Sequence, residues 1–456
     1  MPKTKAAASA LLAGLLLAGC GDGSSPDSKN EHTASAGPSA KASPTPEGPS
    51  VLLTVPSQYD PGKGWQQTLS WMPKNYSAQP LVAVGTRSDT VAHVNTTEDG
   101  YVVQVRDATT GKIRFTGEPW EPPAPKEKTN SLFGHSVQLP SVSTTVQNGR
   151  EYVVLWAHGV LGADALDKGK EIVRLLVYPM NASGSAVAPT REIDIPVELF
   201  ALGRDYLRVV DLGTGLQVHW EARNTDKEAV AVNVTNGTLD HCADACSESI
   251  GRLWTDKGWV VSDYSQDTVS MPKSWHITDD APPGAKYAQD SASGNGAYVG
   301  ITGGHLFTRW KAESGSVMHP LTALHDAATG KLETSIVCDR PSEGDTVSSP
   351  NGRFVASGTV AFDLQQRSGF CLDAGKERKA SVYIRSITDE GIAYGGLDHT
   401  PREGEETAEV DLSSGTAAPA LLPEGTVLPH LTLKNTGVFL TPSPDDGVLI
   451  SVLRHK

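Results

Sequence analysis

The stretch Asp107-Ala-Thr-Thr-Gly-Lys-Ile113 is repeated almost unchanged as Asp326-Ala-Ala-Thr-Gly-Lys-Leu332. In each copy the aspartate side chain can accept hydrogen bonds from backbone N–H groups a few residues further on, which closes a hairpin turn. Gly111 and Gly330 supply the positive φ that other residues resist. The repeat therefore predicts a recurring pair of β-strands joined by the same tight turn.

Looser copies of this turn set the repeat length. They are Asn233-Val-Thr-Asn-Gly-Thr238 and Asp411-Leu-Ser-Ser-Gly-Thr416. The two best copies start 219 residues apart, about four units of 55, and the copies at 233 and 326 start 93 apart, about two units of 46. Periods of about 40–50 residues with four strands each are typical of β-propeller blades.

A second turn also recurs. The segment Ser349-Pro-Asn-Gly-Arg-Phe-Val-Ala356 places Pro350 and Gly352 where a type I turn prefers them, directly before a strand. The segment Ser443-Pro-Asp-Asp-Gly447 is a longer variant before a strand that is expected to start at Val448.

Short β-type runs fill the chain between the turns. Within 101–106, period two puts Tyr101, Val103 and Val105 on one face and a more polar set on the other, as in a half-buried strand. Further runs of this composition are 151–156, 172–178, 207–210, 259–261 and 448–452. Only 161–170 is compatible with a helical turn or two, so the pattern predicts an all-β chain.

We expect residues 51–456 to form a single β-propeller. These 406 residues give about 58 per blade for seven blades or about 51 for eight; seven is favoured, with insertions near 118–131 and 160–170. The first and last strands would share a blade, so 430–455 should lie beside 51–90. A pair of β-sandwiches is the alternative, although sandwiches give no such fixed period.

The repeated elements resemble known families. The strand followed by Asp-Ala-x-Thr-Gly-Lys resembles the blades of quinoprotein-type β-propellers, and the segment 349–356 is similar to the blades of the periplasmic Tol-system propeller. The resemblance implies a propeller over residues 75–456. Quinone-dependent members place a Trp soon after the turn and many carry adjacent cysteines, but neither feature occurs here. The turn motif is therefore interpreted as structural.

The first 50 residues indicate export. A basic start is followed by the apolar run 6–17, which is too short to span a membrane, and then by Leu17-Ala-Gly-Cys20. This arrangement resembles the lipobox of bacterial lipoproteins. The resemblance implies removal of a signal peptide over 1–19 and lipidation of Cys20 with diacylglycerol, with palmitate among the expected acyl chains. An ordinary signal peptide with a chance cysteine is the alternative.

The segment that follows the lipobox has the composition of a spacer. Residues 21–50 contain no Val, Ile, Leu, Met, Phe, Trp or Tyr, so they cannot bury enough surface to offset the entropy of ordering. We expect 20–50 to be the lipidated cysteine and a disordered Ser/Pro/Ala/Gly spacer. The propeller would then sit on the outer face of the cell membrane, held by its lipid anchor.

The four cysteines beyond the lipobox suggest two disulfides in an oxidising compartment. Cys242 and Cys246 lie in one polar loop, and Cys338 can pair with Cys371 if their strands are neighbours. The alternative makes His241, Cys242 and Cys246 soft ligands for copper or zinc. However, His241 and Cys242 are adjacent in the chain and no fourth ligand is apparent. We expect disulfides, with no bound metal or cofactor.

No catalytic constellation stands out. The sequence lacks Gly-x-Ser-x-Gly, His-Glu-x-x-His and P-loop patterns. The pairs Trp156/His158, Trp275/His276 and Asp398/His399 could line a pocket, although a histidine beside a blade turn more often bonds the backbone. A net charge of −14 argues against a general nucleic-acid binder.

The sequence thus predicts a membrane-tethered extracytoplasmic lipoprotein whose propeller binds a protein, peptide or glycan partner on an end face, with no catalysis evident. One alternative is an extracytoplasmic propeller enzyme, either quinone-dependent or a lyase or hydrolase. Another is a copper- or zinc-handling lipoprotein.

Overall fold

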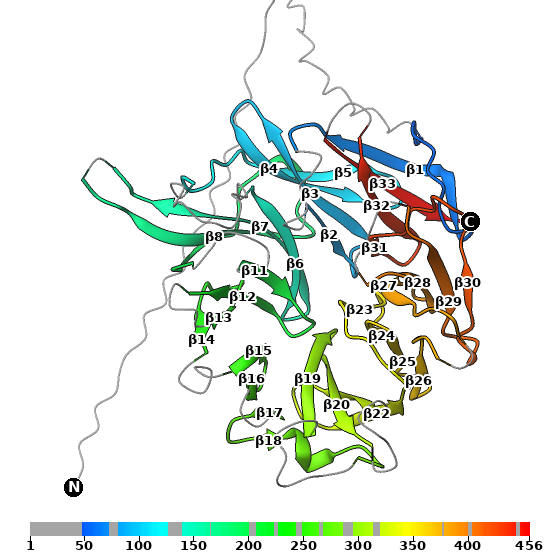
Figure 1. The fold of residues 1–456 in the computed structure, drawn as a ribbon. Helices are drawn as coiled ribbons and strands as arrows, with labels where there is room; N and C mark the ends of the chain where they lie inside the picture. The colour runs from blue at the N-terminus through cyan, green and yellow to red at the C-terminus, as the bar shows by residue number, and fades with distance from the viewer. Residues whose placement is uncertain are drawn as a thin grey trace, which may run out of the picture. The chain divides into compact units, whose positions relative to one another are not determined.

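The structure, a computed structural model, describes residues 48–72, 81–125, 139–164, 166–199, 207–222, 227–242, 249–263, 268–285, 295–312, 320–375, 378–399, 404–443 and 447–456. These residues form eight sheets, called blades 1 to 8 here, which follow one another around a ring (Figure 1). The chain is an all-β single propeller, as expected. The expected lipidation site, Cys20, and most of the spacer lie outside the described residues.

The first half of the ring holds blades 1 to 4. Their strands, in hydrogen-bonding order, are β2 (Val82–Gly85), β3 (Thr90–Thr97), β4 (Gly100–Asp107) and β5 (Ile113–Gly117), with β9 (Gly184–Val187) added to β5; β6 (Ser141–Gln147), β7 (Arg150–Leu161), β8 (Lys170–Pro179) and β10 (Arg191–Pro196); β11 (Leu207–Asp211), β12 (Leu216–Glu221), β13 (Lys227–Val232) and β14 (Leu239–His241); and β15 (Ser249–Thr255), β16 (Gly258–Asp263), β17 (Thr268–Met271) and β18 (Trp275–His276).

Blades 5 to 8 complete the ring. A short 3₁₀ helix, η2 (Ile277–Asp280), precedes them. Their strands are β19 (Asn295–Thr302), β20 (His305–Lys311), β21 (Pro320–Asp326) and β22 (Leu332–Val337); β23 (Thr346–Ser348), β24 (Phe354–Ser357), β25 (Val360–Asp363) and β26 (Ser368–Cys371); β27 (Tyr383–Ile387), β28 (Ile392–Gly396), β29 (Thr407–Asp411) and β30 (Pro419–Leu421); and β31 (Leu431–Thr432), β32 (Thr436–Pro442), β33 (Val448–His455) and β1 (Tyr59–Leu69).

The favoured count of seven blades is wrong, and the alternative of eight is correct. In blade 4 the outer strands are short and the turn between them carries no Asx–Gly motif. Lys273, at φ +66°, takes the left-handed conformation there that glycine takes elsewhere. Blade 6 likewise lacks the Asx–Gly turn between its outer strands, since Arg367 at φ +53° stands four residues after Asp363, in the place of the turn glycine.

The predicted ring closure is confirmed. β1, from the start of the described chain, pairs antiparallel with β33, from its end, and Trp65 lies opposite Val452. The side chain of Gln66 also donates a hydrogen bond to the Ser451 hydroxyl at 2.9 Å. The ends of the propeller sequence are therefore fastened together within blade 8.

The repeated turns occupy equivalent positions. All four copies connect the third and fourth strands of a blade, in blades 1, 3, 5 and 7. In the first, Asp107 Oδ1 accepts hydrogen bonds from the Thr110 N–H at 2.9 Å and the Thr110 hydroxyl at 2.8 Å. Asp326 Oδ1 accepts the corresponding bonds from Thr329 at 2.8 and 2.6 Å. Gly111 and Gly330 both have φ +69°.

The two best copies rest on tryptophans from the preceding blade. The Trp65 Nε1–H, from β1, donates to Ala108 O at 2.9 Å, and the Trp275 Nε1–H, from β18, donates to Ala328 O at 3.2 Å. A Cβ on Gly111 would lie 2.6 Å from Trp65 Cγ. Glycine is therefore required at this position by both its φ and the close approach of the indole.

The predicted type I turn at 349–352 is also present. The Gly352 N–H donates to Ser349 O at 2.9 Å, and Gly352 has φ +72°. The Phe354 N–H, at the start of β24, donates to the Ser349 hydroxyl at 3.0 Å.

Blades bury both of their faces, so the half-buried strand expected at 101–106 is wrong. On β4, Val103 is 0% exposed, and on the opposite face Val102 is 3% and Gln104 8% exposed. Each blade packs between two neighbours, and both faces of a strand therefore meet another sheet. Hydroxyls on inner strands add hydrogen bonds between blades, as from Thr346 to Ile301 O at 2.6 Å and from Thr432 to Ile387 O at 2.7 Å.

The two ends of the propeller differ in their connections. Because strands alternate in direction, the links from first to second and from third to fourth strand share one end, the turn face. Most are tight, such as Gly303–Gly304 between β19 and β20. The remaining links share the other end, the long-connection face, where 118–140 joins β5 to β6 and 161–170 spans the β7–β8 hairpin.

The helical turn considered for 161–170 is not found in its described residues. β7 extends to Leu161 and β8 begins at Lys170, and Gly162 and Gly169 have positive φ. Within the part of the chain that the structure describes, no helix has the length and apolar character to cross a membrane.

Candidate functional site

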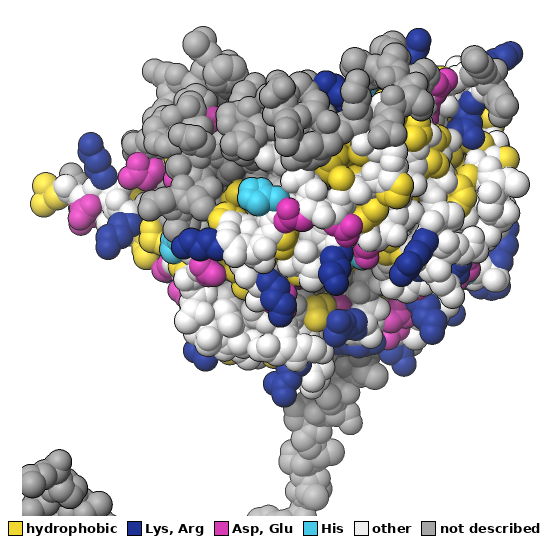
Figure 2. Space-filling view, turned by 90° about the horizontal axis from the view of Figure 1, so that it is seen from below, with side chains coloured by type: hydrophobic (Ala, Val, Ile, Leu, Met, Phe, Trp, Pro, Cys, Tyr) yellow, Lys and Arg dark blue, Asp and Glu magenta, His cyan; other side chains and the backbone are white. Residues whose placement is uncertain are grey.

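The β7–β8 hairpin projects beyond the other blades (Figure 1). β7 has 12 residues and β8 has 10, so this pair extends further than its neighbours at the long-connection face. Figure 2 shows the projection at the left, with hydrophobic, acidic and basic side chains close together. Its tip is well placed to meet another molecule.

Side-chain hydrogen bonds fix the tip. Asp164 Oδ1 accepts the N–H groups of Leu166 and Asp167, both at 2.7 Å, and Asp167 Oδ1 accepts the Gly169 N–H at 2.8 Å. The bond from Leu166 and then that from Asp167 hold the pKa of Asp164 below its usual value. This turn holds Leu166 outward, with 99% of its surface exposed.

The base of the hairpin is held by a buried polar pair. His158 Nε2 lies 2.9 Å from Glu171 Oε1, and the two side chains are 2% and 8% exposed. The Val160 N–H donates to Ala124 O at 2.8 Å, and the Val197 N–H donates to Glu171 O at 3.0 Å. These two backbone hydrogen bonds join the hairpin to the connection before β6 and to the residue that follows β10.

A groove of about 1440 Å³ runs between this hairpin and blade 3. Its apolar lining includes Val160, Val197, Trp220 and Ala222, from the hairpin, the connection after β10, and β12 with the residue that follows it. Trp220 is 9% exposed and Val197 4%, so the apolar lining belongs to the core of the propeller.

Acidic side chains predominate around the groove. Asp164, Asp167, Glu171, Glu198 and Glu228 line it together with two lysines, 168 and 170. The groove therefore combines an apolar wall with a negative rim, which suits an apolar ligand that also carries positive charge.

The turn face carries a hollow of the opposite character. It measures about 930 Å³ and is lined by Arg87, Arg150 and Arg191 among others. The Glu151 carboxylate accepts the N–H groups of Arg87 at 3.2 Å and Ser88 at 3.0 Å. The two hollows thus differ in the sign of their charged lining.

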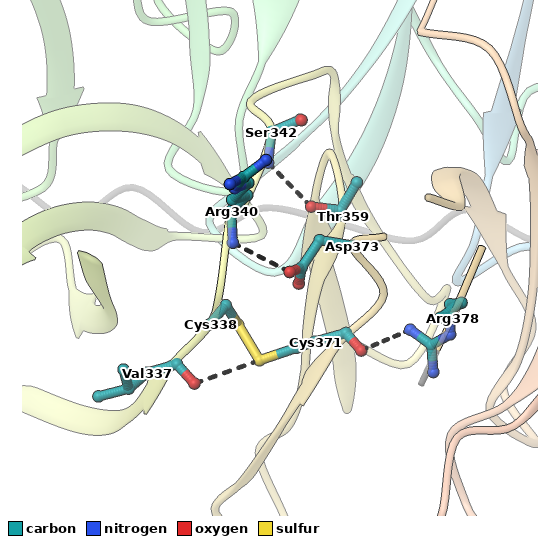
Figure 3. Close-up of a disulfide and its surroundings, with 8 residues drawn as sticks. All are labelled: Val337, Cys338, Arg340, Ser342, Thr359, Cys371, Asp373 and Arg378. Carbon is teal, nitrogen blue, oxygen red and sulfur yellow. Dashed lines mark hydrogen bonds between the residues drawn. A yellow bond between two sulfur atoms is a disulfide. The ribbon is translucent and has the colours of Figure 1, made fainter. Parts of the chain in front are cut away.

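The disulfide predicted between Cys338 and Cys371 is present, with Cα atoms 5.5 Å apart (Figure 3). It joins the ends of β22 and β26, and so links blades 5 and 6. Cys242 is buried and is also disulfide-bonded. Its expected partner Cys246 lies outside the described residues, and His241 is exposed at the end of β14.

The three histidine-containing pairs that could line a pocket do not come together. Trp156 and His158 are buried in β7, and Trp156 Nε1–H donates to the Ser143 hydroxyl at 3.1 Å. His276 is exposed beside η2. His399 Nε2 lies 3.0 Å from Glu343 O, in a separate part of the ring.

The groove residues Trp220, Glu198 and Glu228 were missed in the sequence. They come from three separate segments, and none belongs to a recognisable motif. The sequence feature that pointed to this region was the insertion expected near 160–170, whose residues form one wall of the groove.

Comparisons with known proteins identify no family for this chain. No protein-family model matches the chain, and no curated protein matches it. Among solved structures, the chain is similar to the β-propeller domain of Cps50 (Swd1) from Myceliophteria thermophila, at TM-score 0.36 and 12% identity, over 84% of this chain and 98% of that one. It is also similar to KlAtg21, solved in complex with the coiled coil of AgAtg16, at TM-score 0.36 and 10% identity, over 83% and 95%.

Proposed function

We propose that this chain is a membrane-tethered extracytoplasmic protein whose groove between the β7–β8 hairpin and blade 3 binds a segment of a protein partner. The observation that carries the proposal is the groove itself, in which an apolar wall and an acidic rim lie beside a fixed, projecting hairpin. Binding surfaces on propellers differ from one protein to another, so the fold alone does not identify the binding surface of this one.

The size and lining of the groove favour a peptide as its occupant. Small-molecule pockets usually measure about 300–1,000 Å³, and this groove, at about 1440 Å³, exceeds that range. Trp220 is only 9% exposed, which is unsuited to stacking against a sugar ring. The partly exposed side chains of Val160 and Ala222 could contact an apolar side chain of such a segment, and flanking Lys or Arg would match the acidic rim.

The tether rests on the sequence before the propeller. Leu17-Ala-Gly-Cys20 supplies the lipidation signal, and the spacer that follows gives reach. A flexible coil of 30 residues spans roughly 30 Å. The propeller would therefore stay near the membrane while its long-connection face remains free to meet a partner.

A peptide selection tests the groove. The full-length chain, purified in detergent, is used to select from a random peptide library. We expect enrichment of peptides that place Lys or Arg beside a large apolar residue. The double variant Glu198→Lys/Glu228→Lys should bind them about tenfold more weakly, because each rim contact contributes up to about 1 kcal/mol.

The matched control is Glu424→Lys, a charge reversal at an exposed site on the connection between blades 7 and 8. It should leave the affinity unchanged. Selection of acidic peptides, or equal weakening by the control, would show that the groove is not the binding site.

The tether is tested separately by Cys20→Ala. Metabolic labelling with palmitate should mark the natural chain and not the variant, and the variant should leave the membrane fraction. Retention of label by the variant would contradict the lipidation proposal without bearing on the groove.

A further inference from the structure

The seam between blades 5 and 6 places two sulfurs and a carboxylate together, at a distance along the ring from the proposed groove. We propose that Cys338, Cys371 and Asp373 form, once their disulfide is reduced, a binding site for a thiophilic divalent cation such as Zn²⁺.

The ligand atoms are already gathered in the oxidised protein. The two Sγ atoms and one carboxylate oxygen of Asp373 all lie within 4.8 Å of one another. Thiolate sulfur and carboxylate oxygen are both common ligands of Zn²⁺, and three protein ligands leave one tetrahedral position for water or another group. The set therefore has the composition of an open zinc site.

Asp373 is buried, but it does not use all of its hydrogen-bonding capacity. Only 6% of the residue's surface is exposed. One oxygen, Oδ2, accepts the Arg340 N–H at 3.0 Å, while the other, Oδ1, is buried with no hydrogen-bond partner among the described residues. A buried carboxylate oxygen without a partner is costly, and a cation would remove that cost.

Hydrogen bonds from neighbouring residues fix the backbone on both sides of the disulfide (Figure 3). Arg378 Nη1–H donates to Cys371 O at 2.7 Å. On the other side of the seam, the Ser342 N–H donates to the Thr359 hydroxyl at 2.9 Å. These bonds do not involve the sulfurs, so both segments keep their attachments in the reduced protein. The N–H of Arg340 orients the carboxylate as an outer-shell donor does in metal sites.

The chemistry balances with a dithiol as the reductant. The dithiol transfers two electrons to the S–S bond, which breaks to give two thiols, and is itself oxidised to a disulfide. Zn²⁺ then binds both sulfurs as thiolates together with the carboxylate, and the two thiol protons are released to solvent. Transfer of two electrons to a disulfide acceptor would re-form the S–S bond and expel the ion. Metal occupancy would thus follow the redox state of the seam.

The test uses the full-length chain. It is reduced with a phosphine, freed of reductant without air, and titrated with Co²⁺, whose thiolate bonds give charge-transfer absorption, and with Zn²⁺. We expect one ion per reduced chain, none on the oxidised chain, and an unchanged circular dichroism spectrum on reduction. Absence of binding by the reduced chain, or its unfolding, would overturn the proposal.

Variants identify the ligands. Asp373→Asn retains the disulfide and should weaken Co²⁺ binding by the reduced chain about 10- to 100-fold. Asp345→Asn, which changes an exposed acid in the connection between β22 and β23, should have no effect. Cys338→Ser/Cys371→Ser should abolish binding, which excludes the sulfur of Cys242 as the ligand. Equal affinity in the natural chain and Asp373→Asn would exclude this site.

Discussion

At the turn face, the Asp107 turn lies on the indole of Trp65, whereas at the long-connection face the Asp164 turn forms the tip of a free hairpin. Both turns use a carboxylate that accepts backbone N–H groups, and both are followed by glycines of positive φ. The difference lies in what is packed beneath them. One turn stabilises a contact between blades, and the other presents Leu166 to solvent. The same local chemistry therefore serves stability on one face and display on the other.

The largest expected effect tests the packing under the turn face. Trp65 is 0% exposed, so Trp65→Ala should lower the free energy of unfolding by about 3–5 kcal/mol. Trp120 is a partly exposed tryptophan on the long-connection side. The loss in free energy of unfolding for Trp120→Ala should be about 1–2 kcal/mol smaller than for Trp65→Ala. Urea unfolding followed by circular dichroism measures both. Equal losses would remove the energetic distinction between the faces.

A second pair of variants separates backbone strain from steric conflict. Gly111 and Gly162 have φ of +69° and +70°, but a Cβ on Gly111 would meet Trp65, and one on Gly162 would meet nothing within 4 Å. Gly162→Ala should cost about 1 kcal/mol for the left-handed conformation. Gly111→Ala should cost about 1–3 kcal/mol more, from overpacking. If the two variants unfold at the same urea concentration, steric conflict with the indole does not contribute to the loss of stability in Gly111→Ala.

A third pair compares the two aspartates. Asp107→Ala removes the acceptor of the Thr110 N–H and of Arg114 Nη2–H, at 2.9 and 2.8 Å, and should cost about 1–2 kcal/mol of stability. Asp164→Ala should leave the stability almost unchanged, because the side chain is exposed, but it should weaken peptide binding, since the tip loses its fixed shape. Thermal unfolding and binding are measured on both variants. The comparison fails if Asp164→Ala destabilises the chain as much as Asp107→Ala does.

The smallest expected effect is on how the free energy of unfolding depends on pH. Burial, as the main cause, lowers the pKa of His325, beside the Asp326 turn, to about 4. The unfolded chain would protonate this residue below about pH 6.5 while the folded chain does not. The free energy of unfolding should therefore fall by about 1 kcal/mol from this residue between pH 6.5 and 5.5.

The variant His325→Gln should show a flatter dependence of stability on pH than the natural chain. His276→Gln, which changes an exposed histidine on β18 of the neighbouring blade 4, serves as the control and should keep the natural slope. An identical slope in all three proteins would mean that folding does not lower the pKa of His325.

Local features of this fold could be predicted, and contacts between distant segments could not. Asp107 and Gly111 specify their turn through bonds within five residues, so the sequence reveals it. Arg367 adopts the same positive φ without the glycine that signals it, so the sequence does not reveal this turn of blade 6. Trp65 docks on a turn of the next blade, and the groove joins Glu198 to Glu228 across two blades. Such contacts form only when the ring is assembled, so local sequence patterns do not reveal them.

The fastening of β1 to β33 has a consequence for the order of folding. Gln66 and Ser451 meet across 385 residues of sequence. While the chain is being made or exported, β1 emerges first and must wait for β33, with Trp65 and Leu69 lacking the cover that makes them fully buried in the finished ring. The ring therefore cannot close progressively from its N-terminal side. A chain that stops before Val448 would leave its first strand without a partner, however well the intervening blades had formed.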